Sequence, residues 1–328
     1  MIKYFSTGYL SRYILLFFLL LIIWIPSLLV PSGYTGISSY LFDVINIFTS
    51  QNLFIQTGFA AILTIFTALL INKIAVENGF TSKVSTLTSF LYIILASAII
   101  GETHNNPVIW INFIMVFVLS NIFKLPYAKT VAPVIFNASF LLGVASLFYS
   151  QLYFIILFIW ASIIIHRVLT WRNITISLIG ISLPYVYLLT WFFFNDQLLE
   201  DSYVLFNSLQ IDFSLIFLSD PINIIVSTVL FVILMISAFG IAGSLNEKNI
   251  NLRKNLTITF FYLLSAFLIV LVFSKSLISP LLLSIPSSLI ISYWLSNLKN
   301  TRWFDIALLI ITILIILNEY LVLFFNIF

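Results

Sequence analysis

Long apolar runs recur along the whole chain, and they constrain its fold more than any other feature. Because lipid offers no hydrogen-bond partners, a run of about 20 apolar residues satisfies its own backbone by forming a helix. Eleven such runs can be marked, at residues 13–30, 53–71, 84–100, 107–123, 130–148, 152–168, 174–194, 221–243, 256–273, 277–296 and 303–325. We therefore predict an all-α fold, a polytopic transmembrane helical bundle of about 11 spans.

Composition excludes several other classes of protein. Hydrophobic residues make up 62% of the 328 residues and charged residues 8%, whereas soluble domains carry about 25% charged residues. The absence of Cys excludes disulfides, thiolate metal sites and iron–sulfur clusters. The net charge of +3 is small and sits in short loops, so we expect the lipid bilayer as a partner and no nucleic acid. The first run is too long for a signal peptide and lacks a small-residue cleavage site, which predicts a retained first span.

The positions of Lys and Arg predict the orientation of the bundle, because short cytoplasmic loops retain positive charge. Only Lys275 falls on the side predicted to be outside. The others alternate onto the opposite side: Lys3, Arg12, Lys73, Lys83, Lys124, Lys129, Arg167, Arg172, Lys248, Arg253, Lys254, Lys299 and Arg302. This pattern predicts a cytoplasmic N-terminus and an external C-terminus. The polar interruptions of the third run, and the close pair 256–273 and 277–296, leave a re-entrant hairpin open as an alternative to two full spans.

Two outer loops are long and amphipathic. Residues 31–52 contain Ile37, Leu41, Val44, Ile45 and Phe48 at helical spacing, which predicts a short helix in the membrane interface. Residues 195–220 mix acids with aromatic residues in a similar way. We expect one membrane domain over residues 1–328, in which 1–194 form a candidate seven-helix core, 195–220 an outer loop and 221–328 four further spans.

The most unusual polar segment is Gly-Glu-Thr-His-Asn-Asn-Pro at residues 101–107. Glu102 and His104 can share a proton or a divalent metal ion, because a carboxylate and an imidazole lie two residues apart. The alternative is plain helix capping, since Asn106 suits an N-cap and Pro107 the first helical position. Both readings stay open at this point.

Two further charged residues lie in the predicted outer loops. Asp43 is the only charged residue of the first loop and is a candidate general base or metal ligand, with a solvated acid on an interfacial helix as the alternative. Lys275 is the single external cation and is a candidate for contact with a lipid phosphate, or an ordinary loop lysine.

Membrane-embedded polar residues form the last group of candidates. Glu319 lies inside the final run beside Asn318, and acids within spans are functional candidates by default. Asn112 and Asn137 lie in the fourth and fifth runs, where amides commonly bond between helices. The segment from His166 to Arg172, with Trp171, is typical of an interface anchor.

One stretch carries a resemblance to a known family. Residues 137–148 read Asn-Ala-Ser-Phe-Leu-Leu-Gly-Val-Ala-Ser-Leu-Phe, residues 166–172 read His-Arg-Val-Leu-Thr-Trp-Arg, and Gly180 and Leu-Pro-Tyr at 183–185 follow. This pattern resembles an uncharacterised family of polytopic inner-membrane proteins of Bacteroidota, sometimes automatically named carotenoid oxygenase. The resemblance implies location in a bacterial inner membrane. It does not support that name, because such oxygenases hold iron with four His and this chain has two, predicted on opposite sides.

The same stretch is similar, more loosely, to the membrane core of C-type glycosyltransferases, which use polyprenyl-phosphate sugars. That resemblance implies a catalytic acid in the first outer loop, matched by Asp43, and metal-binding residues in the second, matched by Glu102 and His104. The chain departs from the pattern because neither loop contains paired Asp and Glu or Asp-x-Asp. Three functions remain open: an enzyme that uses a polyprenyl-phosphate lipid at the outer face, a transporter or flippase, and a non-catalytic membrane subunit of an envelope complex.

Overall fold

The described part of the chain is helical throughout. The structure is a computed structural model, and it describes residues 2–6, 10–31, 40–49, 52–100, 106–196, 221–272 and 279–327. Within these ranges there is no strand, so the predicted all-α class is confirmed. The predicted outer loop at residues 195–220 falls almost entirely outside the described residues.

The described residues form a series of α-helices and short 3-10 helices. In chain order they are α1 (Ile2–Phe5), α2 (Leu10–Leu29), α3 (Tyr40–Phe48), α4 (Leu53–Glu77), α5 (Leu87–Ile100), α6 (Pro107–Lys124), η1 (Leu125–Tyr127), α7 (Val131–Ser146), η2 (Ser150–Ile155), α8 (Ile156–Ile165), α9 (Trp171–Phe194), α11 (Pro221–Ser244), η3 (Leu245–Glu247), α12 (Ile250–Val272), η4 (Ser279–Leu283), α13 (Ser284–Asn297) and α14 (Arg302–Ile327).

Each of the eleven predicted apolar runs coincides with a helix of this set. Among the described residues, seven helices are long and apolar enough to cross a membrane: Ser11–Leu29, Leu53–Glu77, Pro107–Tyr127, Trp171–Phe194, Ile224–Ser244, Ile250–Val272 and Arg302–Leu321. Helices Leu87–Ala98, Val131–Ser146 and Ser150–Ile165 are apolar but shorter. The chain is therefore a multi-pass membrane protein, and the count of eleven spans stays a prediction.

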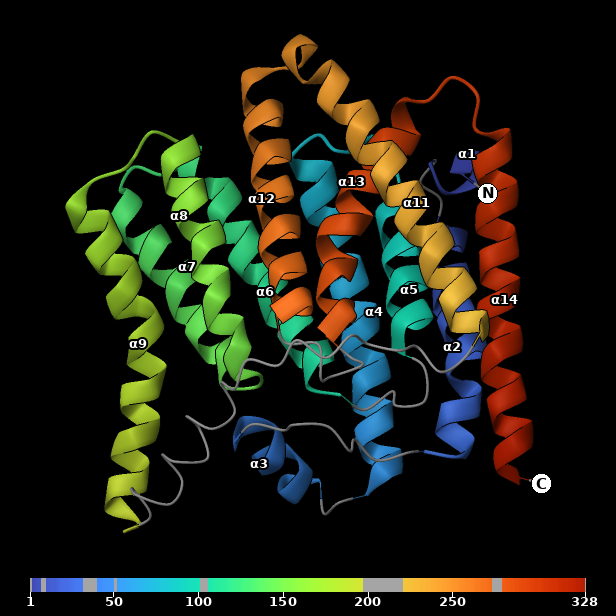
Figure 1. Cartoon of the computed structure of the whole chain (residues 1–328), viewed down its shortest axis with the longest axis horizontal. Coiled ribbons are helices and arrows are strands. Elements are labelled where there is room, and N and C mark those ends of the chain that lie inside the picture. Colours follow the sequence, from blue (N-terminus) through green and yellow to red (C-terminus); the bar gives the residue numbers. More distant parts are fainter. Residues whose placement is uncertain are drawn as a thin grey trace.

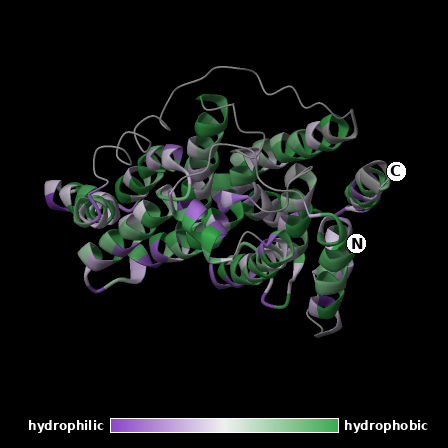
Figure 2. Ribbon diagram, turned by 90° about the horizontal axis from the view of Figure 1, so that it is seen from below, coloured by the Kyte–Doolittle hydropathy of each residue, from purple (hydrophilic) through white to green (hydrophobic). Residues whose placement is uncertain are grey.

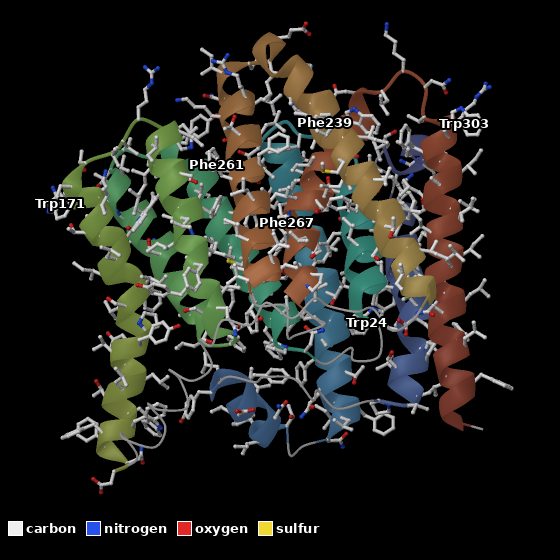
Figure 3. All side chains as sticks on the ribbon, in the orientation of Figure 1. Trp24, Trp171, Phe239, Phe261, Phe267 and Trp303 are labelled. Atoms are coloured by element: carbon white, nitrogen blue, oxygen red, sulfur yellow. The ribbon has the colours of Figure 1, made fainter. Side chains whose placement is uncertain are left out.

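The bundle has one end rich in basic residues. The turns after α6, α8, α11 and α13 lie together at the top of Figure 1, and they bring Lys124, Arg167, Lys248 and Arg302 to the same end. We call this the basic end. The N-terminus lies near it and the C-terminus at the opposite end (Figure 1), and the assignment of these ends to the cytoplasm and the outside stays a prediction. Trp171 and Trp303 are exposed near the basic end on opposite sides of the bundle (Figure 3), the position at which an aromatic belt meets the membrane surface.

Viewed from the end opposite the basic end, hydrophobic residues cover most of the ribbon (Figure 2). Lipid-facing helices have no polar face to solvate, so this pattern is expected of a membrane bundle. The long helices surround two short ones.

Helices α5 and α13 form this enclosed central pair. All side chains from Ser85 to Ala98 are buried, and so are those from Ser284 to Tyr293. Each helix has 14 residues, a length of about 21 Å, which is shorter than the hydrocarbon core of about 30 Å. The predicted runs 84–100 and 277–296 therefore contain the two short helices of the interior, whereas the run 256–273 lies in the full-length helix α12.

The N-terminal segment covers the basic end of α5. The backbone N–H of Thr86 donates to the carbonyl of Phe5 over 2.8 Å, and the Phe5 ring stacks on Phe90 with ring centroids 4.3 Å apart. The backbone N–H of Ile2 donates to Asp305 Oδ1 at the start of α14 over 2.6 Å. These bonds explain why α5 begins at Leu87, three residues after the predicted start.

Helices α7 and α9 pack at the edge of the bundle through glycines. A Cβ atom added at Gly143 would lie 2.6 Å from the carbonyl oxygen of Ile181, and one added at Gly180 would lie 2.8 Å from Ser139 Cβ. Small residues let membrane helices approach this closely. The close van der Waals contact then holds the helices together, because lipid supplies no hydrophobic force between them. The pair therefore depends on backbone-to-backbone contact.

Candidate functional site

Side-chain hydrogen bonds tie the central pair to each other and to α4. Thr88 Oγ1 on α5 donates to Ser292 Oγ on α13 over 3.1 Å, and Ser89 Oγ donates to the carbonyl of Ala68 on α4 over 2.7 Å. Asn72 Nδ2 of α4 donates to the carbonyl of Ser85 over 2.8 Å. The interior is thus joined by polar bonds as well as by packing.

A polar cluster occupies the point where α4, α5, α6, η4 and α13 meet. Asn112 Nδ2 donates to the carbonyl of Leu281 over 3.3 Å and to Ser284 Oγ over 3.1 Å. The hydroxyl of Tyr92 is within hydrogen-bonding reach of Thr67, Asn112 and Ser284. We call Thr67, Tyr92, Asn112 and Ser284 the central cluster.

The central cluster has more acceptors than donors. The hydroxyls of Thr67 and Ser284 donate to the carbonyls of Leu63 and Leu281, each over 2.7 Å, so their remaining capacity is lone pairs. Asn112 Oδ1 is fully buried without a hydrogen-bond partner among the described residues. A buried acceptor left unpaired costs about 1–3 kcal/mol. The cluster is therefore suited to a donor such as a water molecule or the polar end of a ligand.

A groove lies near the central cluster, along the central pair α5 and α13. Its volume is about 320 Å³, it lies between α11 and the central pair, and it is partly open. Leu95, Leu230 and Leu283 are among the apolar side chains that line most of it, and Ser227, Thr228 and Ser287 contribute hydroxyls. Leu95 lies one helical turn from Tyr92, and Ser287 one turn from Ser284, so the groove and the cluster lie on neighbouring turns of α5 and α13.

Asp43 lies on α3, at the end of the bundle opposite the basic end (Figure 1). Its side chain is exposed. The predicted short helix is present, but its buried side chain is Phe42, with Leu41 and Ile45 half-buried and Phe48 exposed. The Tyr40 ring meets Phe192 of α9 edge to face at 4.9 Å, which directs Phe42 inward and leaves Phe48 free for the membrane interface.

The other predicted loop residues, Glu102, His104 and Lys275, lie outside the described residues. Their flanks are described: Asn106 Oδ1 accepts the backbone N–H of Ile109 over 3.2 Å, so Asn106 does cap α6 with Pro107 at its first position. The predicted capping by Asn106 and Pro107 is therefore confirmed, and the shared proton or metal site of Glu102 and His104 stays a prediction. The described residues contain no group of three or more His, Cys, Asp or Glu side chains able to hold a metal ion.

The three predicted membrane-embedded polar residues have different surroundings. Asn112 belongs to the central cluster, whereas Asn137 is exposed on α7. Glu319 of α14 is 5% exposed and hydrogen-bonds with Ser27 of α2, next to Pro26 inside that helix. They therefore lie at three separate places rather than along one path.

Sequence reasoning missed most of the central cluster. Thr67, Tyr92 and Ser284 were not singled out, because hydroxyl residues in apolar runs are common and usually bond their own helix. One signal was available: Ser284, Ser287, Ser288 and Ser292 recur at helical spacing within an otherwise apolar run, which marks a polar stripe on α13.

Comparison with known proteins gives no relative for this chain: no family model, no curated protein and no solved structure matches it.

Proposed function

We propose that this membrane protein binds a lipid-linked substrate inside the bundle and acts on it at the end opposite the basic end. The observation that supports the proposal is the groove near the central cluster, because an apolar groove and a set of polar side chains lie on neighbouring turns of the same helices. An amphipathic molecule needs both surfaces. A solidly apolar interior would offer no place for a head group.

The reaction proposed is group transfer from a polyprenyl-phosphate carrier. In this proposal the hydrocarbon chain lies in the groove, Asp43 acts as general base, and Glu102 and His104 serve as acid or divalent-metal partners. Lys275 contacts the phosphate, for which a cationic donor is well suited. The loop positions of these four residues and the resemblance to C-type glycosyltransferases support the assignment, and the exposed position of Asp43 on α3 is compatible with it.

Binding in the groove can be tested by thiol protection, because the chain has no native Cys. Leu230→Cys places a thiol in the groove, and Val232→Cys places one two residues away on the outward side of α11, where Val232 is 48% exposed. Polyprenyl phosphate should slow maleimide labelling of the first variant and leave the second unchanged. Equal labelling rates with and without the lipid in both variants would exclude the groove as its site.

The chemistry has its own test. Asp43→Ala and Glu102→Ala should each abolish transfer of sugar from a polyprenyl-phosphate donor while the circular dichroism of the helices and lipid protection at Leu230→Cys are retained. Full turnover by both variants would remove these residues from the mechanism. Loss of protection together with turnover would instead indicate a binding defect.

A second candidate is a flippase that moves the same lipid without chemistry. The burial of Glu319 against Ser27 favours it, since buried acids within spans often serve transport. Glu319→Gln should then stop lipid movement in proteoliposomes, whereas Asp43→Ala should not. The enzyme proposal expects the reverse ranking.

A further inference from the structure

The turn between α8 and α9 contains a buried imidazole with unsatisfied nitrogens. His166 follows the last residue of α8, is 8% exposed, and neither Nδ1 nor Nε2 has a hydrogen-bond partner among the described residues. A neutral imidazole offers one donor and one acceptor, and leaving both unused in a buried position costs free energy. The imidazole therefore keeps hydrogen-bonding capacity that none of the described residues uses.

The surroundings of His166 are basic and contain no carboxylate. Lys254 of α12 acts on the imidazole electrostatically, Arg167 follows in the turn, and Arg172 and Arg253 lie on α9 and α12. The elements packed against α8 are α7, α9, α12 and η2. Their sequences contain no Asp or Glu, so no acid on these elements balances the cations.

Apolar side chains next to this turn are exposed. Ile164 is 58%, Leu169 54% and Trp171 79% exposed, and Trp171 lies at the edge of the bundle near the basic end (Figure 3). Trp and neighbouring apolar residues at this depth contact both acyl chains and head groups. A ligand of this site must therefore be anionic at one end and apolar at the other.

We propose that the ends of α8 and α12 form a binding site for an anionic phospholipid, with the phosphate between His166 and Lys254 and the acyl chains beside Ile164 and Leu169. Basic pockets between membrane helices recognise lipid phosphates in this way. The site is independent of the groove and of the function proposed above, because it lies at the opposite end of the bundle.

Binding is tested with full-length protein in phosphatidylcholine nanodiscs that contain increasing phosphatidylglycerol. Lys254→Ala should weaken phosphatidylglycerol binding about fivefold, the effect of one cationic contact at a membrane surface. His166→Asn removes the imidazole's hydrogen bond to the phosphate and should also weaken this binding. Lys299→Ala removes the same charge from an exposed position at the basic end and should change binding little. An equal effect of Lys254→Ala and Lys299→Ala would show diffuse attraction to the membrane and overturn the site.

A second readout follows His166 itself. The chain has two His, so His104→Asn leaves a single imidazole for nuclear magnetic resonance. Its ring resonances should shift with phosphatidylglycerol and stay constant with inorganic phosphate at the same concentration. Equal shifts with both would indicate a site for free anions, and no shift with either would overturn the proposal.

Discussion

The edge pair α7 and α9 and the central pair α5 and α13 solve the same packing problem in different ways. At the edge, Gly143 and Gly180 bring two backbones together and leave no room for a side chain. In the centre, hydroxyl and amide groups such as Thr88, Ser292 and Asn112 bond between helices. Both devices work in lipid, where apolar side chains alone give no net attraction between helices.

The two regions differ in the room that they leave for another molecule. Close glycine packing excludes any molecule between α7 and α9, since even one added carbon would meet the carbonyl of Ile181. Next to the central pair, Asn112 of α6 keeps an unpaired acceptor among the described residues, and a groove lies nearby. A buried acceptor that has no hydrogen-bond donor lowers the stability of the fold. We therefore expect a function in the centre of the bundle rather than at its edge.

The largest effect on this comparison should come from Gly143→Ala. The added Cβ would lie 2.6 Å from a backbone oxygen that cannot turn away, so α7 and α9 must separate at a cost of about 3 kcal/mol. Gly58→Ala is the matched control, because nothing lies within 4 Å of its added Cβ. Unfolding by SDS in mixed micelles measures both, and a Gly143→Ala variant as stable as the Gly58→Ala variant would show that the edge contact is not close.

A smaller loss is expected from Asn112→Ala in the central cluster. The change removes the amide that donates to the Leu281 carbonyl and to Ser284 Oγ. We expect the free energy of unfolding to fall by about 2 kcal/mol. Asn137→Ala deletes the same group from an exposed site and should change the free energy of unfolding by less than about 0.5 kcal/mol. Similar values for the two would contradict the polar centre described above.

The sequence predicts the helices well because apolar length is a local property. Each predicted run coincides with a helix, and the basic residues of the turns lie at one end of the bundle. The beginning of α5 was misplaced because Thr86 bonds to Phe5, a residue 81 positions earlier, and no local pattern encodes that contact.

The candidate site was less predictable, for a related reason. Asn112 and Ser284 are 172 positions apart, so their pairing depends on how α6 packs against α13 rather than on spacing along the chain. The sequence drew attention to charged residues in loops, whereas the described interior uses neutral hydroxyl and amide groups. Asp43 and Glu319, which the sequence also singles out, lie on α3 and α14, away from the central cluster.

A loss of about 1 kcal/mol is expected for Ser89→Ala, which removes the 2.7 Å bond from α5 to the carbonyl of Ala68 on α4. Ser182 Oγ instead donates within its own helix and is exposed, so Ser182→Ala should have almost no effect on unfolding in the same micelles. The contrast tests whether a hydroxyl contributes more when it joins two helices.

The smallest and sharpest effect concerns the bond between Thr88 and Ser292. A double-mutant cycle with Thr88→Val and Ser292→Ala isolates the pair, and membrane hydrogen bonds of this kind average about 0.6 kcal/mol. A coupling of that size would mean that many weak polar bonds hold the short helices α5 and α13. Each such bond is easily exchanged for a bond to a ligand. Zero coupling would mean that packing alone holds the central pair. The hydroxyls of Thr88 and Ser292 would then contribute to ligand binding rather than to the stability of the fold. The central pair would differ from the glycine-packed pair α7 and α9 in function and not in how its helices are held together.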